Sequence, residues 1–252
     1  IFFILFIYCI TEKKVRRYSL FSKFFEFDYS SIKNLSQLGI PISMSIISEI
    51  GAFTMAAIMM GWIGKIELAA HGIALQIASL CYTISLGVAE AGTIRVSYML
   101  GKNDHNGIKN AAKSIFIIWT ALGFLIGIIL FSFSSFLVSM FIEISNEGAD
   151  KILKFGVILL SIAAIVQLVD GLQIISVCLL RGLSDTKVPM LVSVLSYWVI
   201  GITLGYYLSA YTKYGGAGIW VGLAVGIATS AILNMARFKI LSKKITTNLN
   251  KR

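Results

Sequence analysis

Apolar residues in this chain gather in long runs separated by short polar stretches. A helix of about 20 apolar residues is long enough to cross the hydrocarbon core of a bilayer. Several runs are longer than this, which implies that their helices tilt or extend past the hydrocarbon. The pattern therefore predicts an all-α, polytopic transmembrane helix bundle with six complete spans. These spans are expected at approximately 35–60, 67–94, 112–142, 152–180, 189–211 and 216–238.

The segments outside the six spans complete the predicted organisation. Residues 1–10 are apolar, but no basic region precedes them as it does in a signal peptide. We interpret them as the end of a truncated transmembrane helix, and we expect the chain to be a fragment. The segment 11–34 interleaves basic and aromatic residues, which is typical of an amphipathic stretch on the membrane surface. Residues 35–238 are then predicted to form the six-helix lobe, and residues 239–252 a basic tail.

Composition and charge agree with a membrane protein. Hydrophobic residues make up 57% of the 252 residues and charged residues only 13%, whereas soluble domains carry roughly 25% charged residues. The net charge of +10 does not indicate a nucleic-acid partner, because the basic residues lie between apolar runs and not on one soluble face. If the spans alternate in direction, all but four of the 22 Lys and Arg residues lie on one side. The positive-inside rule makes that side, with the 11–34 segment and the C-terminal tail, cytoplasmic. The four exceptions are Lys65, Lys151, Lys154 and Lys213.

Two isolated acids are the main clue to function. Asp170 lies eleven residues before Arg181, and Glu49 lies sixteen residues from the nearest charges, Lys33 and Lys65. A charge at the bilayer centre costs at least ~2.5–3.5 kcal/mol, and such residues usually line an ion or substrate path. A low dielectric disfavours the charged form, so each carboxyl group is expected to exchange a proton near neutral pH or to coordinate Na⁺. The alternative is that each acid pairs with a polar group on another helix.

Polar side chains at helical spacing accompany these acids. Gln167 and Gln173 lie three residues on either side of Asp170. The second span carries a polar stripe that includes Gln76 and Tyr82. These four residues are predicted to support a shared cavity, although interhelical hydrogen bonding explains them equally well. The stripe consists of Gln76, Ser79, Tyr82 and Thr83.

Structural roles are predicted for the remaining polar and glycine positions. We expect Glu90 to be solvated near a span end and His71 to be a hydrogen-bonding residue. Asp185 is expected to cap the following helix or to pair with Arg181. Glycines four residues apart are expected to let helices pack closely in lipid. These glycines are Gly123 and Gly127, Gly201 and Gly205, and Gly218, Gly222 and Gly226.

Nothing in the sequence indicates an enzyme or a bound cofactor. It contains no phosphate-binding glycine loop followed by Lys-Ser/Thr, and its three cysteines have no metal-ligand spacing. His71 and His105 are its only histidines, and neither belongs to a nucleophile–base arrangement. Without a nucleotide site, energy for transport must come from an ion gradient, with Na⁺ or H⁺ as the coupling ion.

Four short motifs lie at the ends of predicted spans. Leu-Gly-Ile-Pro at residues 38–41 opens one span, with Glu49 eight residues after the proline. Ala-Ala-His-Gly-Ile-Ala-Leu-Gln at 69–76 and Thr-Ile-Arg-Val at 93–96 bracket the next span. Leu-Arg-Gly-Leu-Ser-Asp-Thr at 180–186 closes the span that contains Asp170, and this motif is the most specific of the set. Together the motifs resemble the multidrug and toxic compound extrusion (MATE) family of the bacterial multidrug-efflux type.

The resemblance implies a twelve-helix transporter of two six-helix lobes in the cell inner (cytoplasmic) membrane. This chain then covers the end of helix six, the 11–34 inter-lobe segment and the C-terminal lobe, with the N-terminal lobe of the same protein as its partner. The implied activity is extrusion of cationic, amphipathic compounds in exchange for Na⁺ or H⁺. Acids at the positions of Glu49 and Asp170 belong to the cation site of that lobe. Two departures stand out: Val166 replaces a tyrosine expected four residues before the aspartate, and Ser85 replaces a proline.

Two other functions are open at this stage. A lipid-linked sugar flippase of the same superfamily is expected to hold pyrophosphate with several basic residues inside its cavity. In this sequence every Lys and Arg falls at a span end or in a loop, which argues against a flippase. A non-transporting membrane module is the second alternative. A preceding six-helix segment of similar layout would favour the transporter, because such transporters are built from paired repeats.

Overall fold

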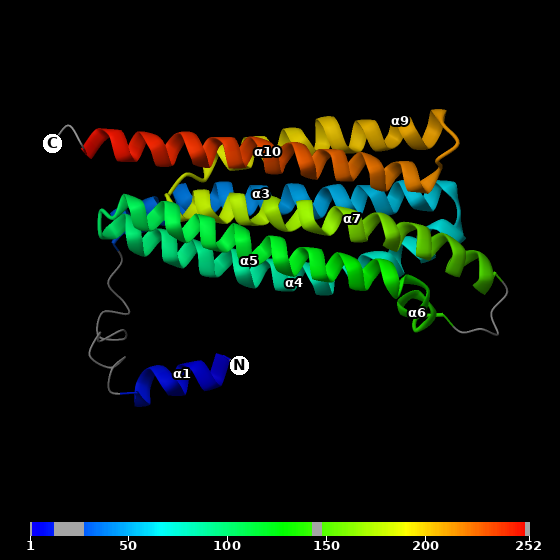
Figure 1. The fold of residues 1–252 in the computed structure, drawn as a ribbon, viewed down its shortest axis with the longest axis horizontal. Coiled ribbons are helices and arrows are strands. Elements are labelled where there is room, and N and C mark those ends of the chain that lie inside the picture. Colours follow the sequence, from blue (N-terminus) through cyan, green and yellow to red (C-terminus); the bar gives the residue numbers. More distant parts are fainter. Residues whose placement is uncertain (1, 13–27, 143–147, 250–252) are drawn as a thin grey trace. The chain divides into compact units, whose positions relative to one another are not determined.

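The computed structural model describes residues 2–12, 28–142 and 148–249, and all of its regular elements are helices (Figure 1). Within these residues, six helical stretches are long and apolar enough to cross a membrane, which confirms the predicted all-α transmembrane fold. The chain divides into two compact units, residues 1–39 and 40–252. The elements are α1 (Phe2–Thr11), α3 (Tyr29–Ile63), α4 (Lys65–Gly101), α5 (His105–Ser132), α6 (Ser134–Ser139), α7 (Ala149–Gly182), α8 (Lys187–Val194), the π-helix η1 (Leu195–Ile202), α9 (Thr203–Tyr211) and α10 (Gly216–Leu249).

Helix α3 begins earlier than the apolar run predicted, at Tyr29 instead of residue 35. Asp28 precedes it and accepts hydrogen bonds from the Ser31 hydroxyl and the Ser30 N–H. These two bonds hold the pKa of the Asp28 carboxyl below its usual value. Pro41 consequently lies well inside the helix, although its motif was expected to open the span. Of the predicted surface segment 11–34, residues 13–27 lie outside the described part of the chain.

The predicted span at 112–142 is wrong at both ends. Helix α5 starts at His105 because the Asp104 side chain accepts the Gly107 N–H at 2.8 Å, which caps the first turn. The helix ends at Ser132, and the non-helical backbone of Phe133 separates it from the short α6. A run of apolar residues indicates only the hydrocarbon-facing part of a helix, so a prediction based on it leaves out polar first turns. Such a prediction also fails to detect a break in the helix when the residues on both sides of the break are apolar.

Helix α7 is the central element of the 40–252 unit. It packs against α4, α5, α6 and α10, and Figure 1 shows α4, α5, α7 and α10 running side by side. Every residue from Gln173 to Leu180 is buried, so this part of α7 is surrounded by other helices. Helix α3 joins the bundle through side chains: the Trp198 indole donates to the Ser48 carbonyl at 3.2 Å.

Glycines bring α10 close to η1 and α9, as the spacing predicted. A Cβ atom at Gly222 would lie 2.2 Å from the Gly205 backbone nitrogen, and one at Gly226 would lie 2.7 Å from the Ser196 carbonyl oxygen. Both neighbours are backbone atoms, so no side-chain rotation makes room. The α5–α7 contact has the same character, since a Cβ atom at Gly127 would lie 2.9 Å from the Ala164 carbonyl oxygen. These contacts confirm that the glycines serve helix packing.

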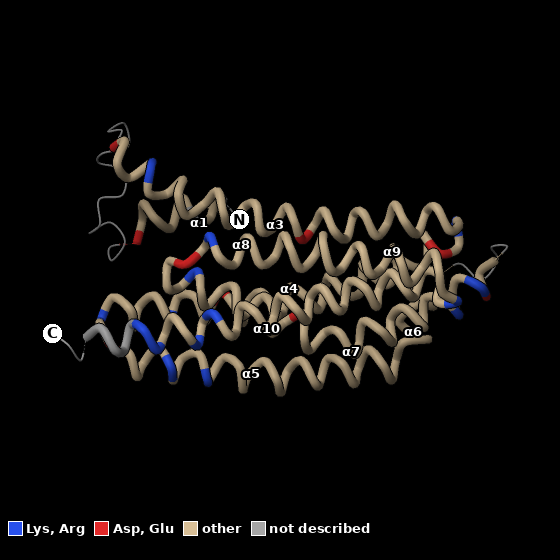
Figure 2. Tube along the Cα trace, turned by 90° about the horizontal axis from the view of Figure 1, so that it is seen from above, with Lys and Arg blue, Asp and Glu red and all other residues tan. Residues whose placement is uncertain are grey.

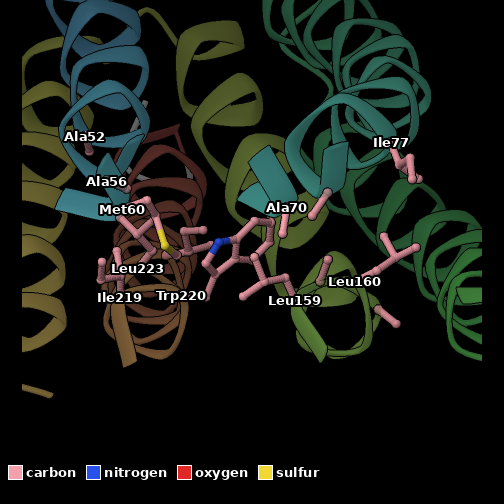
Figure 3. Close-up of a cluster of buried hydrophobic side chains, with 14 of the residues drawn as sticks. Ala52, Ala56, Met60, Ala70, Ile77, Leu159, Leu160, Ile219, Trp220 and Leu223 are labelled. Atoms are coloured by element: carbon pink, nitrogen blue, oxygen red, sulfur yellow. The ribbon is translucent and has the colours of Figure 1, made fainter. Parts of the chain in front are cut away.

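A cluster of apolar side chains from α3, α4, α7 and α10 surrounds Trp220 (Figure 3). The Trp220 indole donates a hydrogen bond to Nδ1 of the buried His71 at 3.0 Å, and the two rings meet edge to face. His71 is therefore the hydrogen-bonding residue that the sequence predicted, and it ties α4 to α10.

Most Lys and Arg residues of the 40–252 unit gather at one end of the bundle (Figure 2), which we call the basic end. Helices α5 and α8 begin there, and α4, α7 and α10 end there. Asp185, in the turn between α7 and α8, forms an ion pair with Arg237 of α10 at 2.8 Å. It neither caps α8 nor pairs with Arg181 as predicted, because its carboxylate is directed towards α10. Glu90, at the same end, is exposed as predicted. Its Oε1 atom lies 3.8 Å from the sulfur of Cys178.

Candidate functional site

A cavity of about 610 Å³ lies between α3, α4, α7 and α10. Its walls are mostly apolar, but Glu49 and Asp170 both line it, from α3 and α7 respectively. The structure thus brings together the two isolated acids that the sequence singled out. The other polar residues on its walls are Thr54, Ser79, Tyr82, Gln167 and Arg181.

The two acids interact with each other across the cavity. Their carboxyl groups are close enough for electrostatic interaction. The Oδ1 atom of Asp170 is buried and has no hydrogen-bond partner among the described residues. Two carboxylates in a poorly solvated cavity repel each other, so one negative charge is neutralised most cheaply by a proton or by a cation held between them. The geometry is that of a site for one positive charge.

Two tyrosines interact with these acids. Tyr82 of α4 is positioned as a hydrogen-bond donor to Glu49. Tyr197 of η1 is 1% exposed, interacts electrostatically with Glu49, Asp170 and Tyr82, and has no hydrogen-bond partner for its hydroxyl among the described residues. Tyr82 was predicted, whereas Tyr197 was not, because one tyrosine within an apolar run has no neighbour in sequence that marks it. A π-helical turn, which is frequent at functional sites, presents it.

Val166 is the first of the two departures from the family pattern. Val166 lines the cavity four residues before Asp170, where the family resemblance implied a tyrosine. The tyrosine hydroxyl that bonds an acid comes from Tyr82 of α4 instead, and it bonds Glu49. At the second departure, Ser85, α4 runs on without a break, and the Ser85 hydroxyl accepts a hydrogen bond from the Gln167 amide at 3.4 Å.

The four supporting residues predicted from the sequence divide into two pairs. Tyr82 and Gln167 line the cavity, but Gln76 and Gln173 do not. Gln76 is exposed on α4 and is not among the residues that line the cavity. Gln173 is buried against α10 instead, where its amide donates to the Ser230 hydroxyl at 3.3 Å, a group that Asn234 also contacts at 3.2 Å. Gln173 therefore takes the interhelical role that was the alternative in the sequence analysis.

Arg181 corrects another expectation. The sequence placed every basic residue at a span end or in a loop, away from a cavity, yet Arg181 lines this one. It lies one residue before the end of α7, and its long side chain reaches back along the helix, with Nη1 3.9 Å from the Cys178 sulfur. The cavity is thus lined by one guanidinium group, that of Arg181, and by the two carboxyl groups of Glu49 and Asp170.

The residues that line the cavity are candidate ligands for two kinds of cation. Carboxylate, hydroxyl and amide oxygens from Glu49, Asp170, Tyr82 and Gln167 are the ligand types that a hard cation such as Na⁺ requires. The volume lies within the range of drug-sized pockets. The aromatic rings of Phe53, Tyr82 and Trp220 on the walls can pack against an organic cation.

A six-span helix bundle with two acids in an internal cavity defines a multi-pass membrane protein built around a polar site. The chain belongs to the MatE family, whose family model matches residues 41–207. This confirms the resemblance seen in the sequence.

Known proteins similar to this chain agree with that membership. It is 37% identical over 237 residues to a "Probable multidrug resistance protein NorM" of Agrobacterium fabrum, which covers 94% of the chain and 51% of the relative. It is 39% identical over 239 residues to the protein of the same name in Rhizobium meliloti, with 95% and 51% covered. The chain thus spans about half the length of these relatives.

Solved structures show the same fold. A crystal structure of MATE in the straight conformation superposes with a TM-score of 0.85 at 18% identity, covering 96% of this chain and 54% of that one. An outward-facing multidrug resistance MATE family transporter superposes with a TM-score of 0.80 at 17% identity, covering 96% and 54%.

Proposed function

We propose that this chain forms one lobe of a cation-coupled antiporter that extrudes cationic, amphipathic drugs across the cytoplasmic membrane. The observation that carries the proposal is the convergence of Glu49 and Asp170 in one internal cavity. The multidrug resistance names of the relatives support the substrate class. A second lobe of the same protein is the expected partner, because the relatives are about twice as long as the matched region.

In the proposed mechanism, Asp170 and Glu49 hold one positive charge at a time. The apolar and aromatic walls bind the body of an organic cation while the acids neutralise its charge. When Na⁺ or H⁺ reaches the acids from the side of higher concentration, they no longer attract the drug, which leaves. Tyr82 and Tyr197 orient the carboxyl groups and supply neutral oxygens. The exchange is driven by the ion gradient, since a unit charge crossing 100 mV gains ~2.3 kcal/mol.

The orientation belongs to the proposal as well. We place the basic end of the bundle in the cytoplasm, because Lys and Arg in short loops favour that side. The turn between α7 and α8 and the end of α10 then face the cytoplasm.

A lipid-linked sugar flippase is the second candidate, and Arg181 is the observation in its favour. A pyrophosphate carries several negative charges, however, and the cavity offers one guanidinium beside two carboxylates. The match to the MatE family model and to multidrug resistance relatives also supports the antiporter.

The direct test is ethidium efflux from cells that express the complete protein, with sodium and pH varied independently. For an antiporter of this kind, ethidium efflux is expected to accelerate when an inward gradient of either Na⁺ or H⁺ is imposed. Efflux is expected to stop when that gradient is collapsed. Efflux that ignores both gradients would rule out cation coupling.

Removing the hydroxyl of Tyr197 is expected to weaken ion coupling more than drug binding. Tyr197→Phe keeps the buried ring but deletes an oxygen that interacts with both acids. The hydroxyl has no hydrogen-bond partner among the described residues, and in the proposed mechanism it forms one to a charged carboxylate. Such a bond is worth about 1.5–3 kcal/mol, so the apparent affinity for the coupling ion should fall about tenfold or more. The measurement is the ion dependence of ethidium efflux by the complete protein. Tyr206→Phe, at an exposed position on α9, is the control and should change nothing; equal behaviour of the two variants would exclude a role for Tyr197.

A further inference from the structure

A second cavity, of about 1030 Å³, lies at the basic end of the bundle between α5 and α10, and none of its lining residues lines the acid-lined cavity. Its mouth is cationic. Lys109 and Lys113 line it from α5, Lys239 and Lys243 line it from α10, and no Asp or Glu is found among its described lining residues. We call this cavity the lysine groove.

The lysines face the groove because of their spacing. Residues four apart lie on one face of a helix, so each helix presents its pair to the same side. Helix α5 starts at this end and α10 finishes there, which brings the two pairs to the same level. Several ammonium groups around one groove attract an anion to the space between them. The groove is therefore complementary to a ligand with more than one negative charge.

The deeper part of the groove is apolar. Phe116, Ile117 and Ala121 line it from α5, and Met235 lines it from α10. Ala121 is eight residues further along α5 than Lys113, which is ~12 Å towards the middle of the bundle. Ile117 is 59% exposed in this membrane-spanning bundle, so this wall is open to lipid. A cationic mouth at the membrane surface thus continues into an apolar floor at the depth of the acyl chains.

We propose that the lysine groove binds an anionic phospholipid with two phosphate groups. The phosphates lie between the lysines, and an acyl chain follows the floor formed by Phe116, Ile117 and Ala121. Basic pockets between transmembrane helices are known to hold such headgroups. A free phosphate ion satisfies the lysines but leaves the apolar floor without a ligand, which is why a lipid fits better. This site is independent of the proposed transport function.

The test is titration of the purified complete protein with diphosphatidylglycerol, read by native mass spectrometry. The double substitution Lys109→Gln/Lys113→Gln is expected to weaken lipid binding about tenfold or more, because each lysine near an anionic headgroup contributes separately. The single substitution Lys239→Gln is expected to weaken it about fivefold. The matched control is Lys187→Gln/Lys244→Gln, which removes the same charge from exposed positions of the basic end outside the groove. It should change the affinity less than twofold.

A further variant separates a lipid from a free anion. Ala121→Phe fills part of the floor without changing any charge and should weaken lipid binding at least threefold, while inorganic phosphate at millimolar concentration should not displace the lipid. A loss of lipid affinity that is confined to the groove variants supports the proposal. An equal loss of lipid affinity in the groove and control variants would show only diffuse attraction to a basic surface and would overturn the proposal. Displacement by phosphate, with Ala121→Phe binding like the unmodified protein, would also overturn it.

Discussion

Asp170→Asn is expected to abolish drug efflux by the complete protein while leaving its amount in the membrane unchanged. The substitution preserves the size of the side chain but removes the negative charge that attracts a cation into the cavity. It also relieves the repulsion between Asp170 and Glu49, so the melting temperature of the purified protein should stay constant or rise. Loss of function without loss of stability is the signature of a residue kept for its charge.

The control for this prediction is Asp104→Asn, which makes the same chemical change at the exposed start of α5. Asparagine is as good an N-cap as aspartate, so both efflux and stability should be retained. The measurements are ethidium efflux, membrane abundance and thermal unfolding of the three proteins. Unchanged efflux in the Asp170→Asn protein would remove this residue from the mechanism.

Gly222→Ala is expected to cause a large loss of stability by adding one methyl group between two helices. The new Cβ atom would lie 2.2 Å and 2.3 Å from the backbone N and Cα of Gly205. Helices η1 and α9 must then separate from α10, at a cost of about 1–3 kcal/mol. Because Tyr197 lies on η1, the displacement also moves its hydroxyl away from the acids, and efflux should fall together with stability.

Gly87→Ala is the matched control for the glycine contact. Gly87 lies within α4, and no heavy atom is found within 4 Å of a Cβ atom added there. Replacing glycine by alanine inside a helix without a clash usually stabilises it by a few tenths to 1 kcal/mol. Thermal unfolding of the purified proteins in one detergent gives the comparison. Equal melting temperatures for the two variants would contradict the packing described for α10.

The fold could be predicted from the sequence to the level of its spans, because hydrocarbon-facing helices must be long and apolar. The details that failed depend on local chemistry or tertiary contact. Asp104 starts α5 seven residues before its apolar run, Phe133 breaks a run that is apolar on both sides, and η1 has no sequence signature. The glycine faces were predictable, since few roles other than close packing explain glycines four residues apart on one face.

The residues of the site could be predicted only where a charged residue lies within an apolar run. Glu49 and Asp170 were found because a lone acid in an apolar run is costly. Their meeting in one cavity depends on how α3 and α7 pack, which spacing along a helix does not determine. Gln173 shows the limit: it shares a helix with Asp170 but faces Ser230 on α10. Tyr197 was missed for the same reason, because its interaction with the two acids depends on tertiary packing.

The central claim is that Glu49 and Asp170 hold either the coupling ion or the drug, and it is tested most directly by competition. Ethidium fluorescence reports binding to the purified complete protein while Na⁺ is raised at constant ionic strength or pH is lowered at constant Na⁺. We predict that the apparent dissociation constant for ethidium rises in proportion to the concentration of one of these ions, and that Asp170→Asn abolishes this dependence. Ethidium affinity that stays constant against both ions would contradict the account.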